Sequence, residues 1–135
     1  MPVNPDLQGR TYPPTSPVLV TAERIAAFAA AVGASDPGAA IAPPTFAIVV
    51  QQAALDGLLA DPDTGIEIRN VVHGEQRFAS ARPIVAGDEL TGTMTVTGIR
   101  TLGANAMVTA ETVIVDASGA TVATATSMLL VGGES

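Results

Sequence analysis

The sequence contains no cysteine and no tryptophan, and it has one tyrosine, one histidine and only six lysine or arginine residues. The missing cysteine excludes disulfides, thiolate nucleophiles and cysteine-based zinc sites, and it suits a reducing compartment. With a net charge of −7, the chain cannot build the basic face that nucleic acid binding requires. No signal segment or bilayer-length apolar run is present, so we expect a cytoplasmic protein that binds neither nucleic acid nor membrane.

What the sequence does contain is apolar: 47% of the residues are hydrophobic and 14% are charged. A length of 135 residues predicts a single domain, residues 1–135, that needs no disulfide or metal to fold. Residues 1–17 are rich in proline, which predicts an extended N-terminal segment. A surface so poor in charge is typical of a chain that a partner covers in part, so we expect a homodimer or a heterodimer.

Two helices are predicted in the first half of the chain. Thr21 is suited to cap the first helix, Glu23 favours its first turn, and Gly33 is suited to end it. Pro43 and Pro44 suit the start of a second helix. The run over residues 45–60 is apolar on nearly all sides, which predicts a buried helix, and its Gly57 could allow close approach to a sheet.

The second half of the chain is strand-like. Even positions over residues 66–78, including Ile68 and Val72, are largely apolar and odd positions are mostly polar, which predicts a strand with one buried face. Three further strands follow, joined by turns, and we expect a four-strand meander. The predicted fold class is therefore α+β: a single hot-dog fold, in which a curved antiparallel sheet wraps a long buried central helix.

Five stretches of the sequence resemble one known family, the MaoC-like hot-dog dehydratases and hydratases. The most specific stretch is residues 82–90, where Pro83 precedes a Gly87-Asp88 turn. The resemblance is greatest to an actinobacterial branch of N-terminal MaoC-like domains, which includes the non-catalytic subunit of heterodimeric (3R)-hydroxyacyl-thioester dehydratases. The other four stretches are residues 9–14, 31–37, 42–46 and 73–78.

Active members of that family carry the motif Asp-x-Asn-Pro-x-His on the loop before the buried helix. Adding or removing water beside a thioester needs proton transfer at two positions and a polarised carbonyl, and an acid with an imidazole near a helix start supplies both. In this sequence the motif positions hold Ala34, Asp36, Pro37 and Ala39, so that only the proline remains. The resemblance therefore implies that this chain has no catalytic residue in the motif, whose Asp and His positions are vacated at Ala34 and Ala39.

The resemblance also places an acyl channel at the start of the second helix. It makes Pro44, Thr45 and Phe46 candidates for substrate binding, because amide groups at a helix start can bind a carbonyl. The simpler alternative is that Thr45 caps the helix. Asp36 is a further substrate-binding candidate, for which a turn before Pro37 is the simpler interpretation.

Two other residues offer alternatives for catalysis. Hot-dog thioesterases use a carboxylate on the helix to direct water, which makes Asp56 an alternative catalytic residue, although we favour a solvent-facing position for it. His73 could act as an acid–base group, but its position among charged neighbours on the expected outward face favours a surface or interface histidine.

We therefore expect a channel-forming subunit of a (3R)-hydroxyacyl-thioester dehydratase of fatty-acid-type metabolism, paired with a catalytic hot-dog partner that supplies the Asp and His. The alternatives are a stand-alone acyl-thioesterase that uses Asp56 and a non-enzymatic acyl-binding or scaffolding homodimer. The expected ligand is an acyl thioester of coenzyme A or acyl carrier protein, and no cofactor or metal is expected. The negative charge argues against direct docking of an acidic carrier protein on this subunit.

Overall fold

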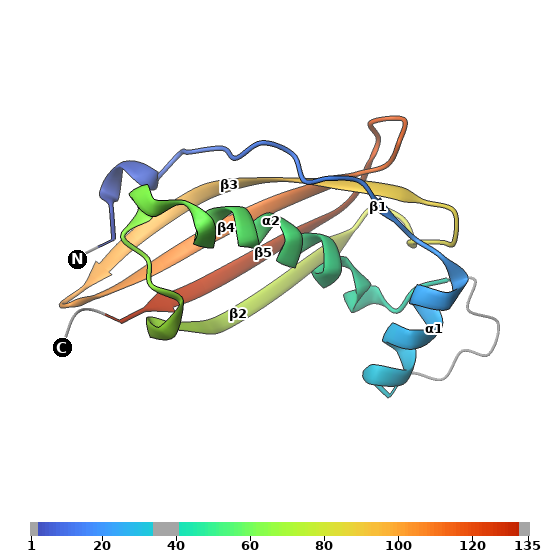
Figure 1. Cartoon of the computed structure of the whole chain (residues 1–135), viewed down its shortest axis with the longest axis horizontal. Coiled ribbons are helices and arrows are strands. Elements are labelled where there is room, and N and C mark those ends of the chain that lie inside the picture. The colour runs from blue at the N-terminus through green and yellow to red at the C-terminus, as the bar shows by residue number, and fades with distance from the viewer. Residues whose placement is uncertain (1–2, 34–40, 133–135) are drawn as a thin grey trace.

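Five antiparallel strands curl around one side of a long helix in the computed structural model, which describes residues 3–33 and 41–132 (Figure 1). The expected α+β hot-dog fold is confirmed. Short 3₁₀ turns cover Pro5–Leu7 (η1), Pro44–Ala47 (η2), Pro62–Thr64 (η3) and Ile68–Asn70 (η4). The helices and strands in chain order are β1 (Val18–Leu19), α1 (Ala22–Ala31), α2 (Ile48–Ala60), β2 (Val71–Ser80), β3 (Glu89–Leu102), β4 (Asn105–Val115) and β5 (Thr121–Val131).

The ends of α1 are those predicted from the sequence. The hydroxyl of Thr21 accepts a hydrogen bond from the amide of Arg24 at 3.1 Å, which satisfies one of the free N–H groups of the first turn. Gly33 follows the helix with a φ of +75°, a left-handed conformation that glycine adopts without strain. Local sequence chemistry is sufficient to set both ends.

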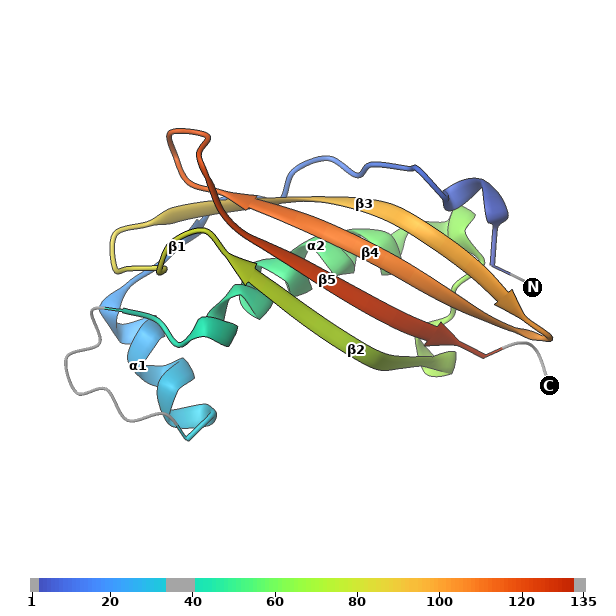
Figure 2. The same ribbon diagram turned by 180° about the vertical axis from the view of Figure 1, so that it is seen from behind.

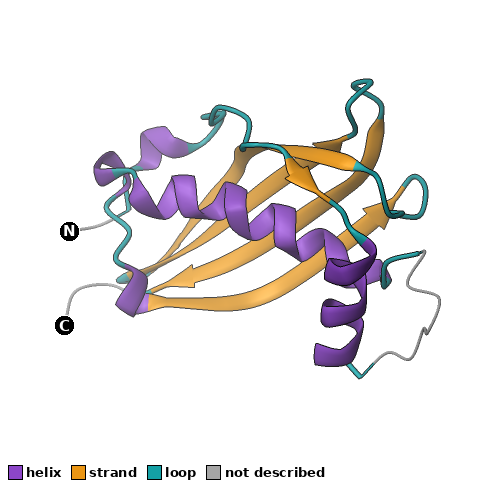
Figure 3. Cartoon of the chain, turned by 45° about the vertical axis from the view of Figure 1, so that its right-hand side comes forward, coloured by secondary structure: helices purple, strands orange, loops and turns teal. Residues whose placement is uncertain are grey.

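The helix α2 packs against the concave side of the sheet, while no other described element covers its opposite side (Figures 1 and 3). The residues that it buries toward the sheet are Val50, Gln51, Ala54, Leu55 and Leu58. The residues that it leaves exposed are Gln52, Ala53, Asp56, Gly57 and Ala60. The expected close approach of the sheet at Gly57 is wrong, because a Cβ built there meets nothing within 4 Å.

The order of the strands in the sheet is β1-β3-β4-β5-β2. Only β3, β4 and β5 form a meander, so the expected four-strand meander is wrong. β2 pairs with β5 on the far edge instead of with β3, which follows it in the chain. Figure 2 shows β2 along this edge, beside β5. A loop between β2 and β3 carries the chain across the end of the sheet, a long-range connection that local sequence patterns do not specify.

A β-bulge interrupts β2 at Gly74. His73 pairs with Leu129 and Glu75 pairs with Met128, so that Gly74 is the extra residue. The bulge reverses the alternation of faces, and it puts His73 on the same concave face as Gln76, whose partner Ser127 is buried. The predicted outward orientation of His73 is therefore wrong.

The predicted burial of Ile68 and Val72 is also wrong. Val72 comes before the bulge and lies on the opposite face from His73, where its side chain is 61% exposed. Ile68 lies in the turn η4 before the strand, and it is 72% exposed. Two large apolar side chains are thus uncovered where β2 begins.

The N-terminal segment runs along the free edge of β3, as Figure 1 shows. Backbone bonds join Gly9 and Arg10 to Val96, and Tyr12 to Met94, while β1 pairs with the start of β3. The segment is extended as predicted, apart from the turn η1. Beyond these elements, no helix in the described ranges is long and apolar enough to cross a bilayer.

The same segment is tied to the end of α2 by side chains. Arg10 forms ion pairs with Asp61 at 3.2 Å and with Asp63 at 3.0 Å. The hydroxyl of Tyr12 donates to Asp61 at 2.7 Å. Burial of the ring, followed by this hydrogen bond, raises the pKa of Tyr12 to about 12. The N-terminal segment, β3 and α2 therefore form one connected unit.

Candidate functional site

The chain reaches α2 through the 3₁₀ turn η2, and two hollows flank this turn. Neither Pro43 nor Pro44 can donate a backbone hydrogen bond, and the amide of Phe46 donates to the carbonyl of Pro43 at 2.9 Å. No side chain caps the turn or the first turn of α2, so the alternative that Thr45 is a helix cap is wrong. A ligand beside η2 would therefore meet mainly side chains, because the two prolines have no N–H group to offer and the amide of Phe46 is already engaged.

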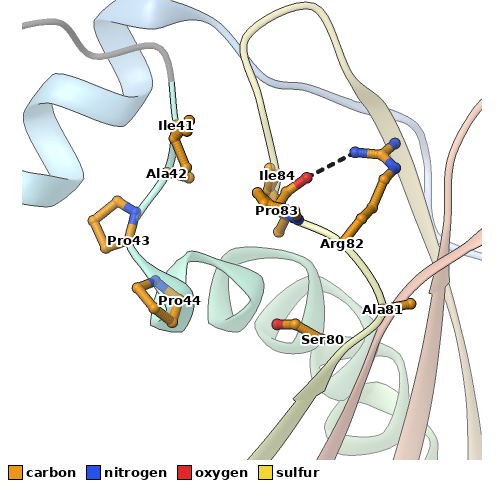
Figure 4. A pocket seen from close by; sticks show the side chains of 9 residues that line it. All are labelled: Ile41, Ala42, Pro43, Pro44, Ser80, Ala81, Arg82, Pro83 and Ile84. Atoms are coloured by element: carbon orange, nitrogen blue, oxygen red, sulfur yellow. Dashed lines mark hydrogen bonds between the residues drawn. The ribbon is translucent and has the colours of Figure 1, made fainter.

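The first hollow is a cavity of about 420 Å³ between the turn η2 and the segment that leaves β2 (Figure 4). The rings of Pro43 and Pro44 lie on one side and Ser80 with Ala81 on the other, as Figure 4 shows. The complete lining is Ile41, Ala42, Pro43, Pro44, Ser80, Ala81, Arg82, Pro83 and Ile84. Its walls are mostly apolar, as is usual for sites that bind small organic ligands.

The one charged residue of this lining, Arg82, is engaged with other groups. Its guanidinium forms two bonds to Asp88, at 2.9 and 3.0 Å, and a third to Asp116 at 3.1 Å. These carboxylates raise the pKa of Arg82, and the guanidinium lowers the pKa of Asp88. A hydrogen bond from Ser118, followed by that from Arg82, lowers the pKa of Asp116 to about 2. The Gly87-Asp88 turn is thereby a structural clamp that holds two loops together.

The second hollow is an open groove of about 770 Å³ on the other side of η2. Four of its lining residues are apolar and come from α1, α2 and β2, while Thr45, His73 and Gln76 are polar. The complete lining is Phe28, Val32, Thr45, Ile48, His73, Gln76 and Phe78. Phe28 is held by an edge-to-face contact with Phe46, whose ring centroid lies 5.3 Å away. An apolar groove with a few polar groups is suited to a ligand that is mostly apolar and carries a polar head.

A buried line of polar side chains reaches this groove from the core beneath α2. Nε2 of Gln51 donates to the hydroxyl of Ser127 at 2.9 Å, and this hydroxyl donates to Oε1 of Gln76. The same Oε1 lies 2.9 Å from Nε2 of His73. Gln51 and Ser127 are fully buried, and Oε1 of Gln51 has no hydrogen-bond partner among the residues that the structure describes. A line of buried polar side chains thus connects the core beneath α2 to the imidazole at the groove.

The predicted site residues lie in different places. Ala34, Asp36 and Ala39 fall outside the described residues. Pro44 lines the cavity and Thr45 lines the groove.

Phe46 and Asp56 line neither hollow. Phe46 is 1% exposed and supports the groove through its ring contact with Phe28. Asp56 is exposed on the outer side of α2 and accepts a hydrogen bond from Gln52 at 3.2 Å.

The chemistry of the two hollows is limited. Among the described residues that line them, there is no carboxylate, and the titratable groups are His73 and the engaged Arg82. Within the described ranges, no three His, Cys, Asp or Glu side chains come together in a way that could hold a metal ion. These linings offer apolar surface and a few polar groups to a ligand, but they do not bring together an acid and a base.

Ser80, Gln76 and Ser127 also belong to this region, although the sequence does not single them out as site residues. Ser80 and Gln76 follow the bulge in β2 and share the face of Phe78, as the predicted alternation of even positions implies. The reversal concerns His73, before the bulge, and Gly74 marks it, because an isolated glycine inside a strand pattern indicates a bulge. Ser127 lies on β5, which reaches β2 only through the order of the strands.

Known proteins are similar to this chain both in sequence and in fold. The family profile described as "FAS1-like, dehydratase domain region" matches residues 7–125. A "UPF0336 protein" of Clavibacter michiganensis is 54% identical over 147 aligned residues, which cover 99% of each chain.

Two solved structures extend the comparison. A chain of the C-terminally truncated HadBC (3R-hydroxyacyl-ACP dehydratase) complex from Mycobacterium tuberculosis has a TM-score of 0.77 and 26% identity, covering 93% of this chain and 97% of that one. The R-hydratase PhaJ1 from Pseudomonas aeruginosa, at a TM-score of 0.70 and 19% identity, covers 94% of this chain and 83% of that chain and shares the fold.

Proposed function

This chain belongs to the family of FAS1-like dehydratase domain regions, which are MaoC-like hot-dog proteins, and we propose that it is the channel-forming, non-catalytic subunit of a (3R)-hydroxyacyl-thioester dehydratase. It acts in the cytoplasm, in fatty-acid-type metabolism, on acyl thioesters of coenzyme A or acyl carrier protein. A catalytic hot-dog partner contributes the Asp and His. In this role the chain binds and orients the acyl group, and proton transfer belongs to the partner.

The observation that carries the proposal is the composition of the groove beside η2. Its described lining offers apolar surface to an acyl chain and no carboxylate to activate water. The sequence supplies alanine at both vacated motif positions, Ala34 and Ala39. General acid–base catalysis at a thioester needs both proton-transfer groups within reach of the reacting carbon atoms, so the missing groups have to come from another chain.

The outer edge of β2 supports the presence of a partner. This strand of ten residues ends the sheet, and its free backbone groups form a template for pairing. Ile68 and Val72 expose apolar surface where the strand begins. The side of α2 that faces away from the sheet is also uncovered, and it carries the small residues Ala53 and Gly57. Edge, apolar side chains and helix face together favour a second hot-dog subunit.

The experiment compares the chain by itself with its complex. The chain is purified alone and together with a hot-dog protein of the same genome whose sequence carries the Asp and His of the motif, and hydration of a short 2-enoyl thioester is measured. We expect hydration by the complex and none by this chain alone. The partner alone, assayed at the same concentration, is the control that separates a contribution of this chain from activity of the partner.

Clear hydration by the chain alone would overturn the proposal. Hydrolysis of an acyl thioester by the homomer, lost in Asp56→Asn, would instead establish a thioesterase. The exposed position of Asp56 and its distance in the fold from both linings give that outcome no support. Binding of acyl thioesters without any reaction in either preparation would establish an acyl-binding homodimer.

A further inference from the structure

The hydrogen bonds around His73 define which ring nitrogen carries the proton. Oε1 of Gln76 is an amide oxygen and can only accept, so Nε2 of His73 donates to it. The same oxygen accepts from Ser127, and Nε2 of Gln76 is engaged with the carbonyl of Arg77 at 3.2 Å. A neutral imidazole with its proton on Nε2 leaves Nδ1 as an acceptor.

The buried part of the line explains why Gln76 keeps this orientation. Ser127 can donate to Gln76 because it receives its own hydrogen bond from Gln51. Gln51 and Ser127 are shielded from water in the core and therefore have no competing solvent partner. Gln51 thus fixes Ser127 as the donor to Oε1 of Gln76. This bond keeps Oε1 in place as the acceptor for the exposed imidazole of His73.

The bulge at Gly74 brings that imidazole to the groove. Without the extra residue, the alternation of the strand would place His73 and Gln76 on opposite faces. Bulges recur beside functional sites, where they reorient a side chain. Here the result is that His73 and Gln76 both line the groove, next to the apolar Ile48 and Phe78.

We propose that His73 is the substrate-contacting polar residue of the groove, and that Gln76, Ser127 and Gln51 are positioning residues that hold its Nε2–H tautomer. In this arrangement Nδ1 accepts a hydrogen bond from the hydroxyl of a 3-hydroxyacyl thioester. The inference rests on the proposed function, and it adds a contact that distinguishes the hydroxyacyl form from an acyl group without the hydroxyl. No bond is made or broken by His73 in this role.

The first test measures the tautomer directly. Because the sequence holds one histidine, a chain labelled with ¹⁵N-histidine gives a single set of imidazole signals. Long-range ¹H–¹⁵N spectra are recorded at about pH 8.5, where a free imidazole is neutral. Free histidine already favours the Nε2–H tautomer in its mixture, so we expect this tautomer essentially alone. A dominant Nδ1–H tautomer, or the mixture seen for free histidine in solution, would overturn the inference.

The second test adds ligand to the labelled chain in complex with its unlabelled partner. Addition of 3-hydroxybutyryl-coenzyme A should shift the Nδ1 resonance, whereas butyryl-coenzyme A, the matched ligand without the hydroxyl, should not. We expect the hydroxyacyl thioester to bind about fivefold more tightly than the acyl thioester. The variant His73→Leu should lose this preference and still bind butyryl-coenzyme A.

The positioning residues are tested through the same signals. Ser127→Ala should give a mixture of the two tautomers and reduce the preference for the hydroxyacyl ligand, and Ser127→Thr, which restores a hydroxyl, should recover both. Ser118→Ala, the same change in an exposed turn, is the matched control and should leave the spectrum unchanged.

The two proposals fail in different ways. Equal affinity for both thioesters, with no shift at Nδ1, would overturn the role of His73 and leave the channel-forming function standing. Failure to bind either thioester would overturn the channel-forming function and, with it, this inference. The measurements on the wild-type chain decide between these outcomes even where a buried variant does not fold.

Discussion

Gly92 is the residue at which helix and sheet approach most tightly among the glycines described. It lies on β3, and a Cβ built on it would stand 2.8 Å from Cγ1 of Val50 on α2 and 2.8 Å from Cγ2 of Thr112 on β4. Both neighbours are β-branched and have little freedom to turn away. The close approach that the sequence analysis assigned to Gly57 is therefore found at Gly92.

We predict that Gly92→Ala lowers the free energy of unfolding by about 1–3 kcal/mol, because the added methyl overpacks the core. Chemical denaturation followed by circular dichroism measures the change. Gly98→Ala on the same strand is the matched control, since the nearest atom to its added Cβ is 3.9 Å away. The control should change the free energy of unfolding by less than about 0.5 kcal/mol. Equal losses in the two variants would contradict the packing argument.

Tyr12 offers a pH-dependent test of the tie between the N-terminal segment and α2. Its pKa is raised to about 12, first by burial and then by the hydrogen bond to Asp61. A group whose pKa is raised on folding stabilises the folded state fully below its unfolded pKa, about 10 for tyrosine. We therefore predict that this contribution is lost as the pH rises from about 10 to 12.

The titration of Tyr12 can be followed by the ultraviolet absorbance of tyrosinate, without interference, because the chain has one tyrosine and no tryptophan. We expect a midpoint near pH 12 in the folded chain. In Asp61→Asn the carboxylate that accepts the hydrogen bond is lost, and the midpoint should fall toward the value of an unfolded tyrosine. A midpoint of about 10 in the wild-type chain would show that the tie does not form.

At the scale of the elements, α2 combines a buried and an exposed side. Gly57 lies on the exposed side with open space around it. Glycine inside a helix is about 1 kcal/mol less favourable than alanine. We predict that Gly57→Ala raises the free energy of unfolding of the isolated chain by roughly this amount. Ala53→Gly, one turn earlier on the same side, is the reciprocal control and should lower it.

The same pair of variants tests what covers this side of the helix. If the partner subunit packs on it closely, Gly57→Ala should weaken the complex even though it stabilises the chain. Titration of the fluorescently labelled chain with its partner measures the affinity of the complex. A stabilised chain with unchanged affinity would show that the partner does not approach the helix at this position.

The elements show which parts of the fold the sequence can predict. Helix ends depend on neighbouring residues, so Thr21 and Gly33 were identified correctly. The position of β2 depends on contact with β5, some 50 residues later, and the reversal at Gly74 depends on a single extra residue. The ends of α1 were therefore predictable and the order of the strands was not, while the facing of His73 is marked in the sequence only by the isolated Gly74.

The residues of the candidate site also fall into those that the sequence indicates and those that it does not. Pro44 and Thr45, in the turn η2 before α2, follow from the resemblance to the family, and the structure places both residues beside a hollow. Gln76 and Ser127 come from two strands that meet only after folding, so no local pattern marks them. The sequence therefore indicates the turn that borders the site, whereas the residues on β2 and β5 opposite this turn are identified only from the folded structure.

At the scale of the whole molecule, the uncovered edge of β2 predicts how the chain assembles. We predict that Val72→Lys dissociates the complex with the partner, because a charge on an edge strand opposes pairing. Val72 is 61% exposed, so the free energy of unfolding of the isolated chain should change by less than about 0.5 kcal/mol. Native mass spectrometry measures the assembly.

A matched control is Leu102→Lys, which adds the same charge to an exposed apolar residue at the end of β3. It should leave the complex intact. Dissociation by both variants would indicate a general effect of charge, and dissociation by neither would show that the partner binds away from β2.

The N-terminal segment that lies along β3 has a consequence for how far assembly can proceed. It occupies one border of the sheet from Gly9 to β1, so that the border at β2 is the one left for another chain. In the language of polymer chemistry, such a molecule is monofunctional: it can join one neighbour, and the product then has no reactive end. Pairing of another chain at β2 would therefore end sheet growth at two subunits, whereas removal of the segment would create a bifunctional unit able to propagate into a filament.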